Sequence, residues 1–133
     1  MWHKSSGGGE AGYHPLRKLK VILSGLRFAV MYDFSVAYKL VISAIVIVLA
    51  LIFQQWIDAQ MLLLATGLVL MAELFNSAIE AVCDFMEPNK NEKIGAIKDI
   101  AAAAVAVIMA VWLIVVIGDV FNIVTALTQR WRG

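Results

Sequence analysis

Residues 100–117 read IAAAAVAVIMAVWLIVVI, eighteen residues without one polar side chain. A helix rises about 1.5 Å per residue, so this stretch covers most of a hydrocarbon core that is about 30 Å thick. The alanines at 101–104 allow a neighbouring helix to approach closely. The stretch therefore predicts a transmembrane helix, which we place at about residues 97–118.

A second apolar block covers residues 40–53, in which Ser43 is the only interruption. Residues 54–56, QQW, end this block and suit the far interface, where tryptophan is favoured. Lys39, near the start, is expected to extend its ammonium to the lipid headgroups. The block predicts a span at about residues 36–56.

A third apolar block starts near Met61 and continues without a break into a polar helical segment that ends at Asp84. The connection at residues 57–60 is very short, so this helix must return antiparallel beside the preceding one. We place this span at about residues 60–85, followed by a polar turn that contains Pro88.

The composition agrees with a membrane protein. Of the 133 residues, 62% are hydrophobic and 16% are charged, whereas soluble domains are about 45–50% apolar. The net charge of +1 gives no basic excess for nucleic acid. Cys83 is the only cysteine, which excludes a disulfide framework. We expect an all-α protein, with one membrane domain over residues 15–133 behind a flexible tail over residues 1–14.

Residues 15–33 predict an amphipathic helix that lies in the membrane surface. Its apolar stripe consists of Leu16, Leu19, Leu23, Leu26 and Val30. An adjacent stripe contains Arg17, Lys20, Ser24 and Arg27. Such a helix buries its apolar face among acyl chains and keeps its cations near phosphate headgroups. An ordinary surface helix packed on protein is the alternative.

Lysine and arginine indicate how the spans are oriented. The N-terminal flank carries Arg17, Lys18, Lys20 and Arg27, and the turn before the last span carries Lys90, Lys93 and Lys98. The turn at residues 57–60 carries neither residue type. Because cytoplasmic loops hold the excess of these cations, we expect the N-terminus and the second turn to face the cytoplasm from the cell inner membrane. Arg130 and Arg132, near the outward C-terminus, weigh against this orientation.

Four polar side chains form one stripe at the cytoplasmic end of the second span. They are Glu73, Asn76, Glu80 and Asp84, spaced i, i+3, i+7 and i+11, with Ser77 beside them. Helical geometry places these positions on one face. A carboxylate near hydrocarbon costs several kcal/mol unless it is paired. Cations must therefore lie close, and Lys98 or a divalent ion such as Mg²⁺ would serve. A polar seam that only joins helices is the alternative.

Other residues leave two interpretations open. Asp33, before the first span, either caps a helix or ligates a metal, and Lys98 and Asp99 could form a plain interfacial pair. The sequence has no phosphate loop, protein-kinase signature, serine-nucleophile elbow or histidine cluster. The available groups are carboxylates, an amide, a lysine and a metal. They fit phosphoryl transfer, which needs positioning, charge neutralisation and a base for a hydroxyl.

The segment ELFNSAIEAVCD, residues 73–84, resembles the signature E-x-x-N-[ST]-A-I-E-x-x-x-D of the small prokaryotic diacylglycerol kinase family, which includes undecaprenol kinases. The resemblance continues into residues 95–99, GAIKD, reaches back to residues 25–27, GLR, and covers about residues 14–118. It implies a homotrimer of three-span subunits, each with a surface helix. It also implies transfer of the ATP γ-phosphate to a lipid hydroxyl at the cytoplasmic interface.

The resemblance further implies roles for individual residues. Glu73 matches the general base, which meets the lipid together with Ser77, and Asn76 matches a residue of the catalytic centre. Asp33 and Glu80 match ligands of Mg²⁺. The positions that match the nucleotide site are Arg17, Asp33, Glu80, Asp84, Gly95, Lys98 and Asp99.

Three positions depart from the family pattern. Asp33 stands where glutamate is usual and is shorter by one methylene, Lys39 stands where some members have an acid, and His14 replaces a commonly basic residue. We expect phosphorylation of diacylglycerol to phosphatidic acid, with undecaprenol as the alternative substrate. A small cation transporter that uses Glu73 and Glu80 is the alternative from another class. The location of nearly all candidate acids at one end disfavours it.

Overall fold

The computed structural model describes residues 14–133, and all but His14 of the tail expected over residues 1–14 lies outside this range. Four helices follow one another: α1 (Pro15–Tyr32), α2 (Phe34–Ile52), α3 (Trp56–Met86) and α4 (Glu92–Arg132). No strand occurs within residues 14–133. Three helices, α2, α3 and α4, are long and apolar enough to cross a membrane. The all-α architecture with three spans is therefore confirmed.

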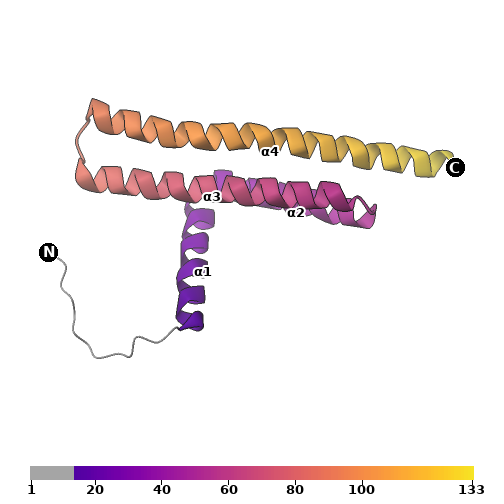
Figure 1. The fold of residues 1–133 in the computed structure, drawn as a ribbon, viewed down its shortest axis with the longest axis horizontal. Coiled ribbons are helices and arrows are strands. Elements are labelled where there is room, and N and C mark those ends of the chain that lie inside the picture. The colour runs from indigo at the N-terminus through magenta and orange to yellow at the C-terminus, as the bar shows by residue number, and fades with distance from the viewer. Residues whose placement is uncertain (1–13) are drawn as a thin grey trace.

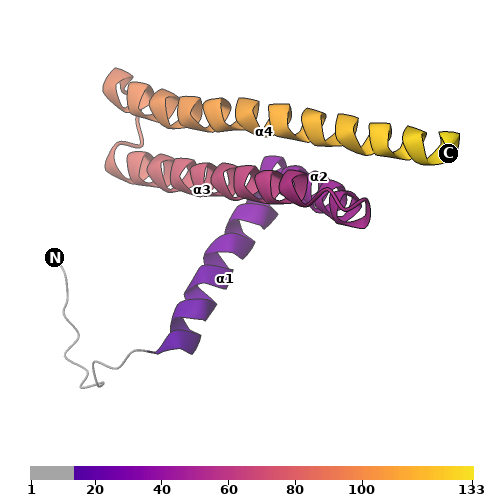
Figure 2. The same cartoon turned by 45° about the vertical axis from the view of Figure 1, so that its right-hand side comes forward.

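The three long helices lie side by side, and α1 runs across their direction (Figures 1 and 2). The chain reverses between α2 and α3 and again between α3 and α4, so neighbours along the chain are antiparallel. The N-terminal end of α1 points away from the other helices. This arrangement agrees with a helix that leaves the bundle to lie in the membrane surface.

The last helix is longer than predicted. We placed the membrane span at about residues 97–118, but the helix α4 continues unbroken to Arg132. Gly118 costs a helix only about 1 kcal/mol and does not end it. Near this end, Asn122 Nδ2 donates to Asp58 Oδ2 of α3 at 2.8 Å, which holds α4 against its neighbour. A helix of this length extends about 60 Å, roughly twice the hydrocarbon thickness, so α4 must continue beyond the bilayer.

The core lies where α2, α3 and α4 meet. Its buried apolar members are Val46, Ala50, Ala59, Leu62, Ala65, Val69, Trp112 and Ile123. One polar cluster joins the three helices within this core. Trp112 Nε1 donates to Ser43 Oγ at 2.9 Å, and Thr66 Oγ1 donates to the same oxygen at 2.8 Å. In lipid, buried polar groups must find partners inside the protein, so this cluster fixes how the helices pack.

Large apolar side chains cover the outside of the bundle. Leu64 of α3 and Ile114 and Phe121 of α4 are 66%, 71% and 71% exposed. An apolar exterior of this extent marks a surface that contacts lipid or protein rather than water. Together with the three long apolar helices, this exterior identifies the chain as a multi-pass membrane protein.

Candidate active site

The polar stripe lies along α3, which is continuous from Trp56 to Met86. Its exposure changes along its length. Glu73 is buried, Asn76 is half-buried, and Glu80 and Asp84 are exposed. The helix therefore leads from a carboxylate enclosed by protein to carboxylates that face outward.

The enclosed end of the stripe contains a buried ion pair. Lys39 Nζ of α2 lies 2.5 Å from Glu73 Oε1, and the two residues are 2% and 6% exposed. Ser35 completes the group, because Lys39 Nζ donates to Ser35 Oγ at 2.8 Å and Ser35 Oγ donates to Glu73 Oε1 at 3.5 Å. The antiparallel packing of α2 on α3 brings these three side chains together.

The prediction that Lys39 reaches the lipid headgroups was wrong. The lysine points into the bundle instead, where the carboxylate of Glu73 offers a full negative charge 2.5 Å from Nζ. The sequence does contain a pattern that predicts the contact between Lys39 and another helix. Ser35, Lys39 and Ser43 are spaced i, i+4 and i+8, so they share one face of α2. A row of polar residues on one face of an apolar helix indicates contact with a protein partner.

One turn beyond Glu73, the stripe has an amide with an unused oxygen. Asn76 Nδ2 donates to Glu80 Oε1 at 3.5 Å. Asn76 Oδ1 is buried and has no hydrogen-bond partner among the residues that the structure describes. Such an oxygen favours a further donor or a metal ion at this point.

The exposed end of the stripe is paired across the turn between α3 and α4. Lys98 Nζ forms an ion pair with Asp84 Oδ1. Asn91 caps α4 by accepting from the backbone N–H of Lys93 and of Ile94, at 2.9 and 3.3 Å. The cap fixes the first turns of α4, which carry Gly95 and Lys98. A cation thus lies at each end of the stripe. Lys98 forms its ion pair with Asp84 and not with Asp99, the next residue in the sequence.

Asp33 and Arg17 lie on other elements. Asp33 caps α2, and its Oδ1 accepts from the backbone N–H of Ser35 at 2.8 Å. This is the helix-cap interpretation, which leaves the second carboxylate oxygen for another role. Arg17 is exposed near the start of α1, the end that points away from α3 (Figure 1). Asp99 is exposed on α4 and Ser77 is half-buried on α3.

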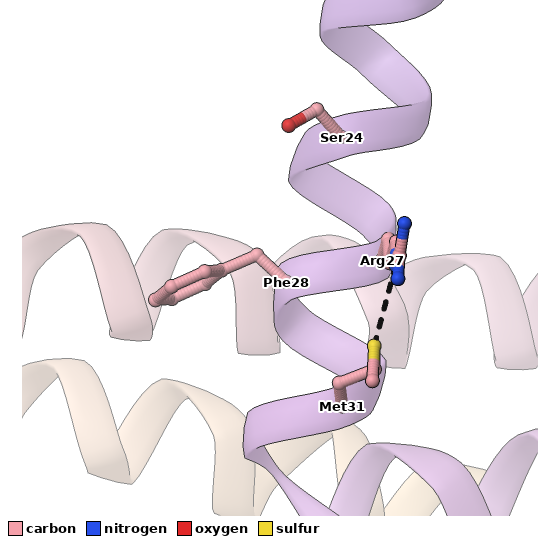
Figure 3. Close-up of a pocket in the computed structure, with 4 residues that line it drawn as sticks. All are labelled: Ser24, Arg27, Phe28 and Met31. Atoms are coloured by element: carbon pink, nitrogen blue, oxygen red, sulfur yellow. Dashed lines mark hydrogen bonds between the residues drawn. The ribbon is translucent and has the colours of Figure 1, made fainter.

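The C-terminal half of α1 contains a shallow pocket that the sequence patterns did not predict (Figure 3). It is lined by Ser24, Arg27, Phe28 and Met31. Arg27 Nε donates to Met31 Sδ at 3.4 Å, one turn along the helix. The contact holds the guanidinium against α1.

The oxygens of the stripe suit a magnesium ion that arrives with a nucleotide. Mg²⁺ is usually held by one or two carboxylates together with substrate phosphates and water. Glu80 and the unpartnered Asn76 Oδ1 supply oxygens of the right kind. Within residues 14–133, no three Asp, Glu, His or Cys side chains gather into a group that could hold a metal ion. The donor set therefore fits an ion completed by phosphate oxygens.

Comparison with known proteins identifies the family. The model of the family described as prokaryotic diacylglycerol kinase matches residues 20–119, about three quarters of the chain. No curated protein and no solved structure matches the chain. The matched segment includes α2, α3, the turn after α3 and most of the apolar part of α4. Membership of a kinase family implies the use of ATP, and this family acts on membrane lipids. The chain belongs to the prokaryotic diacylglycerol kinase family.

Proposed function

We propose that this protein transfers the γ-phosphate of ATP to the hydroxyl of diacylglycerol and produces phosphatidic acid. The observation that carries the proposal is the change in exposure along one face of α3. Glu73 lies about 26 Å along the helix from Trp56, within one hydrocarbon thickness, whereas Glu80 and Asp84 lie about 36 and 42 Å along it. One helix face would thus pass from the lipid phase into the headgroup region.

This change in depth supports different roles for the two ends. At the buried end, Glu73 would accept the proton of the lipid hydroxyl, with Asn76 in the catalytic centre and Ser77 beside the lipid. A lipid hydroxyl sits just below the headgroups, and the position of Glu73 along α3 would bring its carboxylate to that depth. In the transfer, the lipid oxygen forms a bond to the γ-phosphorus, the bond to the β-phosphate oxygen breaks, and ADP leaves.

The exposed end would bind the nucleotide. The residues proposed for this site are Arg17, Asp33, Glu80, Asp84, Gly95, Lys98 and Asp99. Lys98 of α4 supports this proposal, because it forms an ion pair with Asp84 of the stripe. Mg²⁺, held by Glu80 and Asp33, would offset the charge of the phosphates.

The charge distribution supports an orientation in which this end faces the cytoplasm. The end of α3 and the start of α4 share one end of the bundle (Figure 1). Lys90, Lys93 and Lys98 lie there, as the positive-inside rule requires for a cytoplasmic end. ATP is present in that compartment. We further propose that the protein acts as a homotrimer in the cell inner membrane.

The test is phosphate transfer by purified protein in lipid nanodiscs. Radiolabelled ATP is supplied with diacylglycerol, with undecaprenol, and with both in competition. We expect labelled phosphatidic acid as the main product, and preferential labelling of undecaprenol would assign the alternative substrate. Glu73→Gln should lower transfer by at least about 10²-fold, because it removes the base. Glu92→Gln, an exposed acid in the first turn of α4, is the matched control and should keep full activity.

A further inference from the structure

The ammonium of Lys39 has two hydrogen-bond partners and an aromatic ring near it. Its Nζ donates to Glu73 Oε1 at 2.5 Å and to Ser35 Oγ at 2.8 Å, and lies 5.7 Å from the centroid of the Tyr38 ring. An ammonium at this distance from an aromatic face is attracted by it. The residue is 2% exposed, so the lysine is held in one place.

Packing alone does not explain a lysine at this position. Taking two charges out of water is costly, and an apolar side chain of similar volume often stabilises a core as well or better. Methionine or leucine would fill the space beside α3. The charge of Lys39 therefore points to the group that it contacts, and that group is Glu73.

The contacts with Glu73 are uneven. Oε1 accepts from both Lys39 and Ser35. No hydrogen bond from the described residues reaches Oε2, which leaves this oxygen for a further partner. The carboxylate is therefore anchored through one oxygen and has the other available.

We propose that Lys39 is a positioning residue for phosphate transfer. It supplies the counter-charge of the buried Glu73 carboxylate and anchors Oε1, so that Oε2 is directed to the lipid hydroxyl. This inference rests on the proposed function of Glu73 as the base. During transfer the hydroxyl proton passes to Oε2 while the lipid oxygen bonds to the γ-phosphorus and ADP leaves. The neutral acid then leaves Lys39 without a counter-charge, which favours loss of the proton to water and restores the carboxylate before the next turnover.

The charge of Glu73 can be measured without any lipid substrate. Dicyclohexylcarbodiimide enters membranes and reacts with protonated carboxyl groups, and peptide mass spectrometry locates the adduct. We expect low labelling of Glu73 in the parent protein and in Lys39→Arg. Labelling should rise on the order of tenfold in Lys39→Met, because a buried carboxylate without its cation takes up a proton. Lys93→Met, which removes an exposed lysine of α4, is the control and should label like the parent.

The kinetic counterpart separates positioning from folding. For Lys39→Met we expect kcat to fall by about 10²-fold with KM for ATP within about twofold of the parent, and Lys39→Arg to recover part of kcat. Lys39→Gln and Ser35→Ala provide milder changes if the methionine variant does not assemble. Both should raise carbodiimide labelling, with the larger rise for Lys39→Gln.

The outcomes distinguish this inference from the function on which it rests. Equal labelling of Glu73 in the parent and in the variants without a charge at position 39 overturns the inference, even if the parent phosphorylates lipid. Unchanged kcat in Lys39→Met also overturns it. A parent protein that transfers no phosphate to any lipid overturns the proposed function, whatever the labelling shows.

Discussion

At the residue scale, two carboxylates of the stripe have a cation from another helix. Lys39 of α2 pairs with Glu73, and Lys98 of α4 pairs with Asp84. The sequence could predict the stripe, because a shared helix face depends only on spacing. It could also predict that cations must be near. It could not predict that Lys39 is one of them, because this depends on how α2 is rotated against α3.

Asp119 provides a prediction at this scale. It is 4% exposed, and its Oδ2 has no hydrogen-bond partner among the described residues. A buried oxygen without a partner costs about 1–3 kcal/mol. Asp58 lies near enough to repel it, and no cation among the described residues forms an ion pair with either acid. Asp119→Asn keeps the shape, removes the charge and should leave the thermal unfolding temperature in nanodiscs unchanged or higher.

A marked drop in that temperature would contradict this account. It would show that the carboxylate binds a group outside the chain, such as a metal ion or a neighbouring subunit. Asp58→Asn is the matched comparison, since its Oδ2 accepts from Asn122. An asparagine there could keep that bond through its own side-chain oxygen, so we expect a smaller effect than from Asp58→Ala.

At the scale of elements, the apolar spans were easier to predict than their ends. A run such as residues 100–117 can only be a membrane helix, whereas the point at which α4 leaves the bilayer has no breaker to mark it. The same holds for α3, whose polar end continues as helix because nothing stops it before Pro88. The polar end of α3 carries Glu80 and Asp84 of the candidate nucleotide site, so part of that site depends on the continuation of α3 beyond its apolar block.

The ion pair between α3 and α4 gives the prediction for this scale. The side chains of Lys98 and Asp84 are 35% and 66% exposed, so water screens their attraction. Lys98→Met should therefore leave the unfolding temperature unchanged. We expect it to raise KM for ATP or to lower kcat by about tenfold or more, because it removes a cation from the phosphate site. Initial-rate kinetics at varied ATP would measure this, with Lys90→Met in the turn as the control. Loss of stability together with unchanged kinetics would assign a purely structural role to the pair.

At the scale of the whole molecule, one chain does not gather every residue of the proposed site. The stripe lies on α3, but Arg17 lies near the end of α1 that points away from the bundle (Figures 1 and 2). The outer faces of α3 and α4 are apolar and suit contact with further copies as well as with lipid. A surface helix that leaves its own bundle can cover the stripe of a neighbour. The sequence could not show this, because it does not reveal the direction in which α1 leaves α2.

Complementation between inactive subunits tests this arrangement. If Arg17 of one subunit serves the stripe of the next, Glu73→Gln and Arg17→Ala chains mixed in equal amounts will regain activity. A working site then needs an Arg17→Ala chain, which keeps Glu73, beside a Glu73→Gln chain, which keeps Arg17. Random mixing in a ring places this pair at about a quarter of the sites, so activity should recover to about a quarter of that of the parent. Each variant alone sets the baseline. A mixture of Glu73→Gln with Glu73→Ala is the matched control, since neither chain has the base. No recovery from the first mixture, in trimers shown to contain both chains, would mean that each subunit completes its site with its own α1.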